Sequence, residues 1–467
     1  MPFLQPLTRK YFSDSCQSFL TLTHYLIIVV LHQILRRSSV LLSILLLLSC
    51  ATRKDLQVQL TKSFSETNNV TPWFQGIMVY GPATQKVIFE HNSRKYFTPA
   101  STTKLLTFYA GLKLLKDSIP GLNYTVSNDT LYFSGTGDPT FLHKKFNSSN
   151  ILNFLKSTPK TIALVSPEAS QEAFGPGWAW DDYNYGFSAE RSSFPIYGNV
   201  ASFEFTPDSL TVAPSYFHNQ LQPDTTGTFK KVRRDEKINI FKIPLFGTSA
   251  FQQNVPFITS AKLTAELLAD TLKREVIIAE NFPKDLRLKQ QIFSQPVDSI
   301  YKKMLQDSDN LFAEQLLLMA AGEISDTLHA DIVIDHMKQK FLNEMPDDLQ
   351  WVDGSGLSRY NLITPRNMVW LLEKIYSEVE QERLFELLPA GGVTGTIRNN
   401  YKAPEGKPPF VFAKTGTMSN NHSLSGFLVT ASGKVIIFSF MNSNYLVPIA
   451  EVKARMDHVL RTLYLNY

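Results

Sequence analysis

The two ends of the chain carry strand-like sequence, and this arrangement constrains the fold more than any other feature. Residues 76–80 and 86–90 are apolar runs that flank a Gly-Pro turn, which predicts a β-hairpin. Further strand candidates lie near the C-terminus at 410–413, 425–430 and 435–441, and a helix candidate follows at 448–465. We therefore expect one antiparallel sheet that both ends of the chain complete.

The sequence between these strands changes in character twice. A helix with a broad apolar face is expected to start at residues 98–101. From about 124 to 292, short strand-like runs alternate with turns and aromatic residues, which is typical of a β-rich domain. Helical periodicity returns at 300–321, 328–341 and 365–376. The middle domain would then be an insertion, and the fold class would be α+β.

The composition excludes several classes of protein. Of the 467 residues, 43% are hydrophobic and 19% are charged, which indicates a folded chain rather than a disordered or fibrous one. Residues 1–49 contribute +3 of the net charge of +4, so the remainder lacks the positive surface that nucleic-acid binding requires. The two cysteines, Cys16 and Cys50, cannot form a disulfide framework or a zinc site of cysteine pairs. We expect no cofactor, no metal and no nucleic acid.

Residues 1–49 have the features of a targeting segment. Two arginines precede an apolar run at 40–48, which is the order of a secretory signal and is short for a membrane span. The run ends in Leu-Leu-Ser-Cys, which resembles the bacterial lipoprotein box. That resemblance implies a lipid anchor at Cys50, a tether at 50–71 and domains on the periplasmic side of the cell envelope. The alternative is a signal anchor that also uses the apolar residues 25–31.

A serine and a lysine lie three residues apart at the expected helix start. This spacing puts Ser101 and Lys104 on one face, so the amine can act on the hydroxyl. Serine needs an adjacent base to become a nucleophile, and lysine can be that base when burial or a nearby cation keeps it partly neutral. The same spacing recurs at Ser157 and Ser299, and a solvated helix face is the commoner explanation of such a pair.

Two further motifs follow. Ser308 and Asn310 precede a helical stretch, where a helix N-cap is the ordinary interpretation. Residues 414–417 read Lys-Thr-Gly-Thr and end an apolar strand, and Lys-Thr-Gly occurs once in the chain. A cation and hydroxyls on a strand would suit a substrate carboxylate. The ordinary interpretation is a strand end with a solubilising lysine.

The order of these motifs makes the combined signal specific. A hairpin, Ser-x-x-Lys at a helix start, Ser-x-Asn before a helix and Lys-Thr-Gly on a strand resemble the active-site serine penicillin-recognising enzymes. Within that superfamily, further stretches are similar to the penicillin-binding protein 4 family of D-alanyl-D-alanine carboxypeptidase/endopeptidases. These stretches are 135–140, 175–182, 353–359, 388–392 and 395–396. The glycines of the later stretches are expected to shape turns rather than to do chemistry.

The resemblance covers residues 70–460 and implies a domain organisation. It implies a transpeptidase-like peptidase domain, an antiparallel sheet with flanking helices, that contains an inserted β-rich domain. The implied boundaries are a signal segment at 1–49, a tether at 50–71, the peptidase domain at 72–123 and 293–467, and the inserted domain at 124–292.

The resemblance also implies a role for each motif residue. Ser101 would attack the carbonyl between two D-alanines while Lys104 accepts its proton, which gives an acyl-enzyme. Backbone N–H groups of Ser101 and Thr417 would form the oxyanion hole. Ser308 would relay a proton to the leaving amine, and Asn310 would hold the substrate amide.

The remaining implied residues bind substrate. Lys414, Thr415, Gly416 and Thr417 would hold the terminal carboxylate. Asp182 matches an acid of the inserted domain that would bind the amine of a diaminopimelate side chain, and its neighbour Asp181 competes for that role. The implied partners are peptidoglycan stem peptides, with β-lactams as inhibitors.

Two alternatives use the same residues differently. In a β-lactamase, Glu344 would lie where a glutamate could activate the deacylating water, but its segment is polar and turn-like and we interpret its position as a coincidence. A non-catalytic lipoprotein could use the fold to hold the cell wall. A serine hydrolase with a histidine triad and a metallopeptidase are both disfavoured, because Gly-x-Ser-x-Gly and His-Glu-x-x-His are absent.

Overall fold

The computed structural model describes most of the chain after the targeting segment. The described residues are 36, 56–62, 73–147, 149–166, 172–206, 209–244, 249–283 and 285–467. The chain divides into two compact units, Met1–Glu66 and Thr67–Tyr467, and residues 56–62 of the first unit are helical. The predicted lipidation site, Cys50, lies outside the described residues. No helix within the described ranges is both long and apolar enough to cross a membrane.

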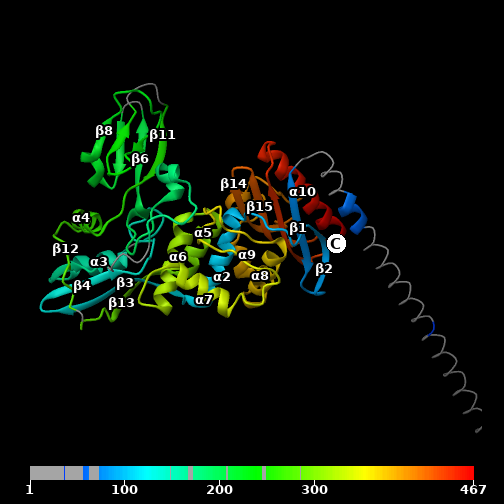
Figure 1. Cartoon of the computed structure of the whole chain (residues 1–467), viewed down its shortest axis with the longest axis horizontal. Coiled ribbons are helices and arrows are strands. Elements are labelled where there is room, and N and C mark those ends of the chain that lie inside the picture. Colours follow the sequence, from blue (N-terminus) through cyan, green and yellow to red (C-terminus); the bar gives the residue numbers. More distant parts are fainter. Residues whose placement is uncertain are drawn as a thin grey trace, which may run out of the picture. The chain divides into compact units, whose positions relative to one another are not determined.

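Strands from both ends of the chain form one antiparallel sheet, as predicted (Figure 1). Its order is β14 (Val411–Met418), β15 (Asn421–Val429), β16 (Val435–Ser443), β1 (Phe74–Gly81) and β2 (Lys86–His91). The C-terminal strand β16 pairs with the N-terminal strand β1 along its length, with Val79 opposite Phe438. Closure of the sheet therefore depends on residues more than 350 positions apart in sequence.

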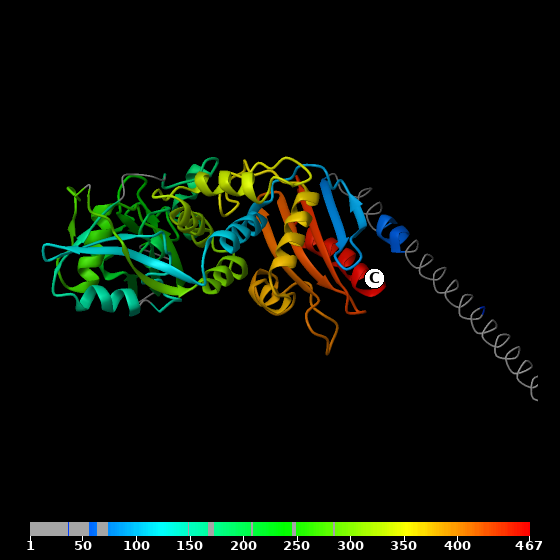
Figure 2. The same cartoon turned by 90° about the horizontal axis from the view of Figure 1, so that it is seen from below.

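Helices cover both faces of this sheet (Figure 2). Helix α10 (Ile449–Asn466) lies on one face, where Met456 contacts Asn442 of β16. Helix α8 (Pro365–Glu378) lies on the other face, in the core that contains Met441. Neighbouring residues of a strand point to opposite faces of the sheet. Asn442 therefore marks the face that α10 covers, and Met441 marks the face that α8 covers.

A helical layer beside the sheet carries the first two motifs. It consists of the 3₁₀ turn η1 (Ala100–Thr103) and helices α2 (Lys104–Leu114), α5 (Val297–Gln306), α6 (Asn310–Ile324), α7 (Ala330–Lys340) and α9 (Gln381–Leu387). Helix α2 is buried from its first residue to Gly111, and α6 is buried from Leu311 to Ala321, because the two helices pack on each other. Both are apolar nearly all round, which is typical of central helices.

Two helix predictions need correction. The helix expected from 98–101 begins as a 3₁₀ turn, and the α-helical part starts only at Lys104. The periodic stretch 300–321 is interrupted, because Ser308 adopts a left-handed backbone conformation (φ 58°) between α5 and α6. Both interruptions fall at predicted site residues, and backbone strain is concentrated at functional sites.

The region between β2 and α5 contains three further sheets. The largest has the order β12 (Ile277–Ile278), β5 (Thr161–Leu164), β4 (Thr130–Gly135), β3 (Ser118–Ser127) and β13 (Gln290–Pro296). The others are β11 (Phe251–Pro256), β6 (Val200–Thr206) and β7 (Ser209–Ala213), and β8 (Leu221–Pro223), β10 (Phe241–Ile243) and β9 (Arg233–Arg234). Helices α3 (Ser149–Ser157) and α4 (Ala261–Leu272) were not predicted. We call residues 118–296 the inserted region.

The inserted region has a hydrophobic core of its own. Phe133, Phe203 and Leu268 belong to that core, whereas Phe108 and Phe312 belong to the core of the helical layer and sheet. A chain segment with its own core is a structural domain in the usual sense. Apolar contacts also join the two domains, since Ala189 and Val200 of the inserted region cluster with Leu311 of α6, and Phe146 stacks on Phe312.

The sheet meets the helical layer where β14 passes η1. A Cβ atom on Gly416 would lie 2.1 Å from the Pro99 carbonyl oxygen and 3.1 Å from the Ser101 nitrogen. Both are backbone atoms, so no side chain can rotate away to make room. The absence of a side chain at Gly416 thus allows the third motif to touch the first.

We expect Gly416→Ala to destabilise the fold by about 1–3 kcal/mol, because the added methyl group must push η1 away from β14. Urea denaturation followed by circular dichroism measures this change. Gly322→Ala is the matched control, since its Cβ would meet only the flexible end of Leu328, at 3.0 Å, and alanine favours a helix. Equal stability of the two variants would contradict the close approach.

Candidate active site

The first two motifs meet at the amine of Lys104. Its Nζ lies 3.0 Å from Ser101 Oγ, 2.6 Å from Asn310 Oδ1 and 2.7 Å from the Ser355 carbonyl oxygen. A neutral amine has two N–H donors and one lone pair. With Asn310 and Ser355 accepting the donors, the lone pair is left to face the Ser101 hydroxyl.

Burial makes this amine a base. Lys104 has no exposed surface, and the loss of water lowers its pKa to about 8. The carboxylates of Asp353, Glu314 and Asp309 act in the opposite sense and limit the fall. A lysine with a pKa near the working pH exists in both forms, as a general base requires.

Ser308 and Asn310 face the site for a reason that the N-cap interpretation missed. The residue that caps α6 is Asp309, whose side chain accepts from the Phe312 N–H at 3.3 Å. With the cap supplied by Asp309, the Ser308 hydroxyl turns to Lys414 Nζ, at 2.8 Å. Asn310 contacts Lys104 through Oδ1 and donates through Nδ2 to the Phe187 carbonyl at 2.9 Å.

The third motif, residues 414–417, belongs to strand β14, which continues to Met418. The interpretation of Lys414 as a solubilising lysine at a strand end therefore needs correction. Lys414 is fully buried and donates to Ser308 Oγ and to the Thr415 carbonyl, each at 2.8 Å. Burial and the charge of Lys104 hold the pKa of Lys414 well below its usual range. The Thr417 side chain is exposed and lies 2.9 Å from His422 Nδ1.

The loop at 353–359, one of the stretches that resemble the family, completes the site. Asp353 accepts from the N–H groups of Gly356 and Ser358, at 2.8 and 2.6 Å, and this folds the loop tightly. Gly356 has φ 79°, and a Cβ there would lie 1.9 Å from the Ala100 carbonyl oxygen, so it shapes a turn as predicted. The loop thereby presents the Ser355 carbonyl to Lys104.

Sequence reasoning missed Ser355, the Phe187 carbonyl, Thr396 and His422. Thr396 lies 2.7 Å from Thr415 through their hydroxyl oxygens. The repeated serines and glycines of 353–359 and 395–396 were a signal for Ser355 and Thr396. A backbone carbonyl leaves no signal in the sequence, and His422 lies opposite Thr417 only through strand pairing.

Asp182 lies in the segment of the inserted region that contributes Phe187. It belongs to the 3₁₀ turn η2 (Trp180–Asn184) and is half-buried, whereas Asp181 is exposed. Burial and the neighbouring Asp181 raise the pKa of Asp182, and the charge of Arg359 opposes them. Within the described residues, the Asp182 carboxylate makes no hydrogen bond to the three motifs.

A protein-family model and known proteins match this chain. The model, described as the D-Ala-D-Ala carboxypeptidase 3 (S13) family, matches residues 56–463. The D-alanyl-D-alanine carboxypeptidase DacB of Haemophilus influenzae is 25% identical over 431 residues, 82% of this chain and 87% of the relative.

Solved structures share the fold. The crystal structure of penicillin-binding protein 4 (dacB) from Haemophilus influenzae has a TM-score of 0.68 and 22% identity, and covers 87% of this chain and 98% of that one. The same protein complexed with a β-lactam has a TM-score of 0.66 at 22% identity and the same coverage. The likeness supports the α+β fold with an inserted domain.

The low pKa of Lys104 predicts how reaction at Ser101 depends on pH. Acylation by benzylpenicillin should speed up about tenfold per pH unit below about 8 and level off above it, because only the neutral amine accepts the proton. Stopped-flow or quenched-flow rates from pH 5.5 to 9 measure the profile. Lys302→Met, which removes the amine of the other helical Ser-x-x-Lys, should leave it unchanged. A flat profile from pH 6 to 8 would contradict the role of Lys104.

Proposed function

The chain belongs to the D-Ala-D-Ala carboxypeptidase 3 (S13) family, and we propose that it cleaves D-alanyl-D-alanine bonds of peptidoglycan stem peptides or cross-links through an acyl-enzyme on Ser101. One observation carries the proposal. The buried amine of Lys104 lies 3.0 Å from Ser101 Oγ and is held by Asn310 and by the Ser355 carbonyl. This is the arrangement of a nucleophile, its base and the groups that orient the base.

The chemical steps follow from these contacts. Ser101 Oγ attacks the carbonyl carbon of the penultimate D-alanine, and its proton passes to Lys104 Nζ. The C–N bond then breaks, and a proton passes to the leaving amine by way of the Ser308 hydroxyl. Ser308 Oγ accepts a hydrogen bond from Lys414 Nζ. Water hydrolyses the ester on Ser101 and completes the cycle. No step requires a cofactor.

The oxyanion and the substrate carboxylate have separate partners. The backbone N–H groups of Ser101 and Thr417 are the candidates for the oxyanion hole, and the close approach at Gly416 supports this, because it brings η1 and β14 together. The carboxylate would bind at Lys414, Thr415 and Thr417. Its negative charge would return the pKa of Lys414 toward the usual range, so substrate binding would favour the charged form of Lys414.

The β-lactamase alternative is disfavoured by the surroundings of Glu344. Its side chain is largely exposed and forms an ion pair with Lys374 of α8, at 3.6 Å. A base that activates a deacylating water must face the acyl group on Ser101. We propose instead that β-lactams acylate Ser101 and leave slowly, so that they inhibit the enzyme.

We also propose that Cys50 carries a lipid and that the enzyme is a membrane-anchored lipoprotein on the periplasmic side of the cell envelope. The support is the sequence of residues 40–50, an apolar run that ends in Leu-Leu-Ser-Cys. A lipid at this position would hold the catalytic domain near the membrane through the tether at 50–71.

Intact mass spectrometry tests the nucleophile and the reaction together. After incubation of the full chain, purified in detergent, with benzylpenicillin, we expect one drug molecule per chain, and none on Ser101→Ala. Ser299→Ala, at the other helical Ser-x-x-Lys, is the matched control and should acylate normally. Absence of an adduct with intact drug would favour the non-catalytic cell-wall-binding lipoprotein, and consumed drug without an adduct would favour a β-lactamase. The mass of the untreated chain reports the lipid on Cys50.

A second prediction concerns substrate selection at Asp182. We expect Asp182→Asn to raise KM about tenfold for a D-Ala-D-Ala peptide with a free diaminopimelate amine, because a charged hydrogen bond is lost. Acylation by benzylpenicillin, which lacks that amine, should not change. Asp181→Asn is the control and should affect KM little, since Asp181 is exposed. The assignment to Asp182 fails if Asp181→Asn has the larger effect or if an acetylated amine gives the same result.

A further inference from the structure

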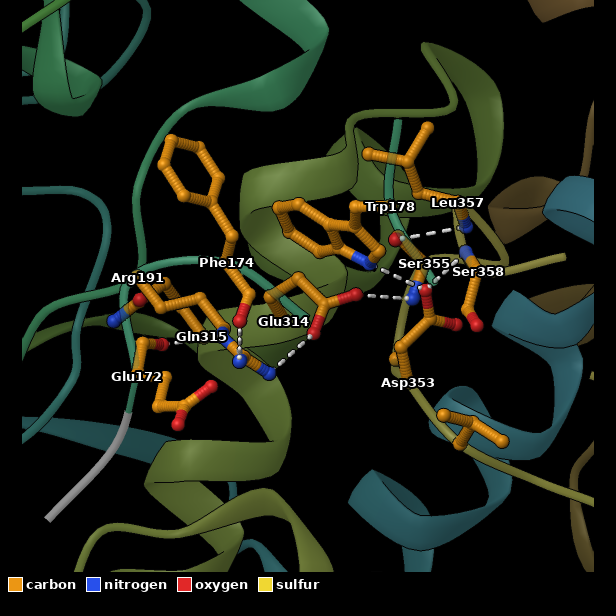
Figure 3. Close-up of polar contacts among 12 residues, drawn as sticks. Glu172, Phe174, Trp178, Arg191, Glu314, Gln315, Asp353, Ser355, Leu357 and Ser358 are labelled. Atoms are coloured by element: carbon orange, nitrogen blue, oxygen red, sulfur yellow. Dashed lines mark hydrogen bonds and ion pairs between the residues drawn. The ribbon is translucent and has the colours of Figure 1, made fainter. Parts of the chain in front are cut away.

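An ion pair outside the three motifs joins the inserted region to helix α6. Arg191 Nη1 lies 3.5 Å from Glu314 Oε2, and the side chains are 2% and 0% exposed (Figure 3). Buried charges are rare in proteins and are costly unless paired, so a pair at this depth calls for an explanation. The chemistry described above gives Arg191 no role, and Glu314 enters it only through its charge, which acts on Lys104.

Glu314 connects directly to the support of the catalytic base. Its Oε1 accepts from the Ser355 N–H at 2.7 Å, and the Ser355 carbonyl accepts from Lys104 Nζ at 2.7 Å. The Glu314 carboxylate therefore holds the N–H group of Ser355, and the carbonyl of Ser355 holds the Lys104 amine. A shift of Glu314 would move the carbonyl that orients Lys104 toward Ser101.

Arg191 connects the same carboxylate to the inserted region. Its guanidinium donates to the Phe174 carbonyl at 2.8 Å and to the Glu172 carbonyl at 3.1 Å, and it lies over the ring of Trp178. Trp178 in turn donates from Nε1 to Asp353 Oδ2 at 2.9 Å. We call residues 172–191 the docking segment, since it contacts both α6 and the loop that contains Ser355.

The charges show why the pair must stay together. Burial and the nearby carboxylate of Asp353 raise the pKa of Glu314, and Arg191 and the hydrogen bonds from Ser355 oppose them. Without Arg191, the ionised carboxylate would lose its counter-charge in a site with no access to water. The cationic partner comes from the docking segment, so seating of the segment favours the ionised form of Glu314.

We propose that Glu314 and Arg191 are positioning residues for the general base: Glu314 acts on Lys104 through its negative charge and fixes Ser355 so that its carbonyl holds Lys104 toward Ser101, and Arg191 supplies the counter-charge from the docking segment. The inference rests on the proposed function, in which Lys104 accepts the serine proton. It makes seating of the inserted region a condition for an active base.

The test must account for every charge that acts on this amine. On Lys104 these are Asp309 before α6, Glu314 on α6, Asp353 in the loop and Lys414 on β14, and on Glu314 they are Asp353 and Arg191. Glu314→Gln removes one negative charge and keeps an oxygen that can accept from the Ser355 N–H. A lysine that loses a nearby negative charge binds its proton less tightly, so the pKa of Lys104 should fall by about one unit.

Two measurements on the full chain in detergent follow this change. The first is an NMR titration of protein labelled with ¹³C at lysine Cε, in which the Lys104 signal is assigned by its absence in Lys104→Met. We expect the midpoint of the Lys104 titration to lie at lower pH in Glu314→Gln than in the wild type. The acid limb of benzylpenicillin acylation should move by the same amount. An unchanged Lys104 titration in folded Glu314→Gln would overturn the proposal.

The counter-charge role of Arg191 needs a double-mutant cycle. We expect Arg191→Met to slow acylation at least tenfold at its optimum pH, and Arg191→Met/Glu314→Gln to recover to within about threefold of the wild type, because the double variant buries no unpaired charge. If Arg191→Met fails to fold, the acylation rate of the double variant can still be compared with that of Glu314→Gln. A double variant slower than either single variant would overturn the coupling.

Gln315 is the matched control. It is fully buried next to Glu314 and also holds the inserted region, since Nε2 donates to the Gly137 and Ser192 carbonyls at 2.7 and 2.8 Å. Gln315→Met should lower stability and leave the Lys104 titration in place, so an equal shift in this variant would count against the proposal. If wild-type chain is not acylated, the proposed function fails, while the NMR titration still decides the role of Glu314.

Discussion

The burial of Lys104 is the constraint on which the rest of the site depends. An amine without exposed surface loses its hydration, and the protein must replace it with acceptors in fixed places. Asn310 at the start of α6 and the carbonyl in the loop of Ser355 accept its N–H groups, and the Ser101 hydroxyl on η1 faces its lone pair. Each of these elements is therefore held in place by the residue that makes Ser101 reactive.

The inserted region takes part in this arrangement, although it has a core of its own. The Phe187 carbonyl fixes the Asn310 amide, and that amide contacts Lys104 through its oxygen. Trp178 and Arg191 reach the loop of Ser355 and helix α6 from the same segment. The insertion is thus part of the support of the base, through residues 172–191.

The sequence predicted the sheet and the three motifs for physical reasons. Strands that are buried on both faces are recorded in the sequence as apolar runs between turns, and the reaction dictates a hydroxyl, an amine and an amide at fixed spacings. The break at Ser308 was not predictable, because its left-handed backbone depends on the neighbouring cap at Asp309. Glu314 and Arg191 could not be found either. Each looks ordinary alone, and only the packing of the inserted region brings them together.

The site holds two buried lysines, and their surroundings differ in a way that suits two tasks. Within the described residues, three carboxylates act on Lys104 and keep its pKa at about 8. Lys414 is affected by burial and by the positive charge of Lys104, and both lower its pKa. One lysine is thus balanced to exchange a proton, while the other has no carboxylate acting on it among the residues that the structure describes. A substrate carboxylate supplies that partner, so the same field that tunes the base also favours substrates with a free C-terminus.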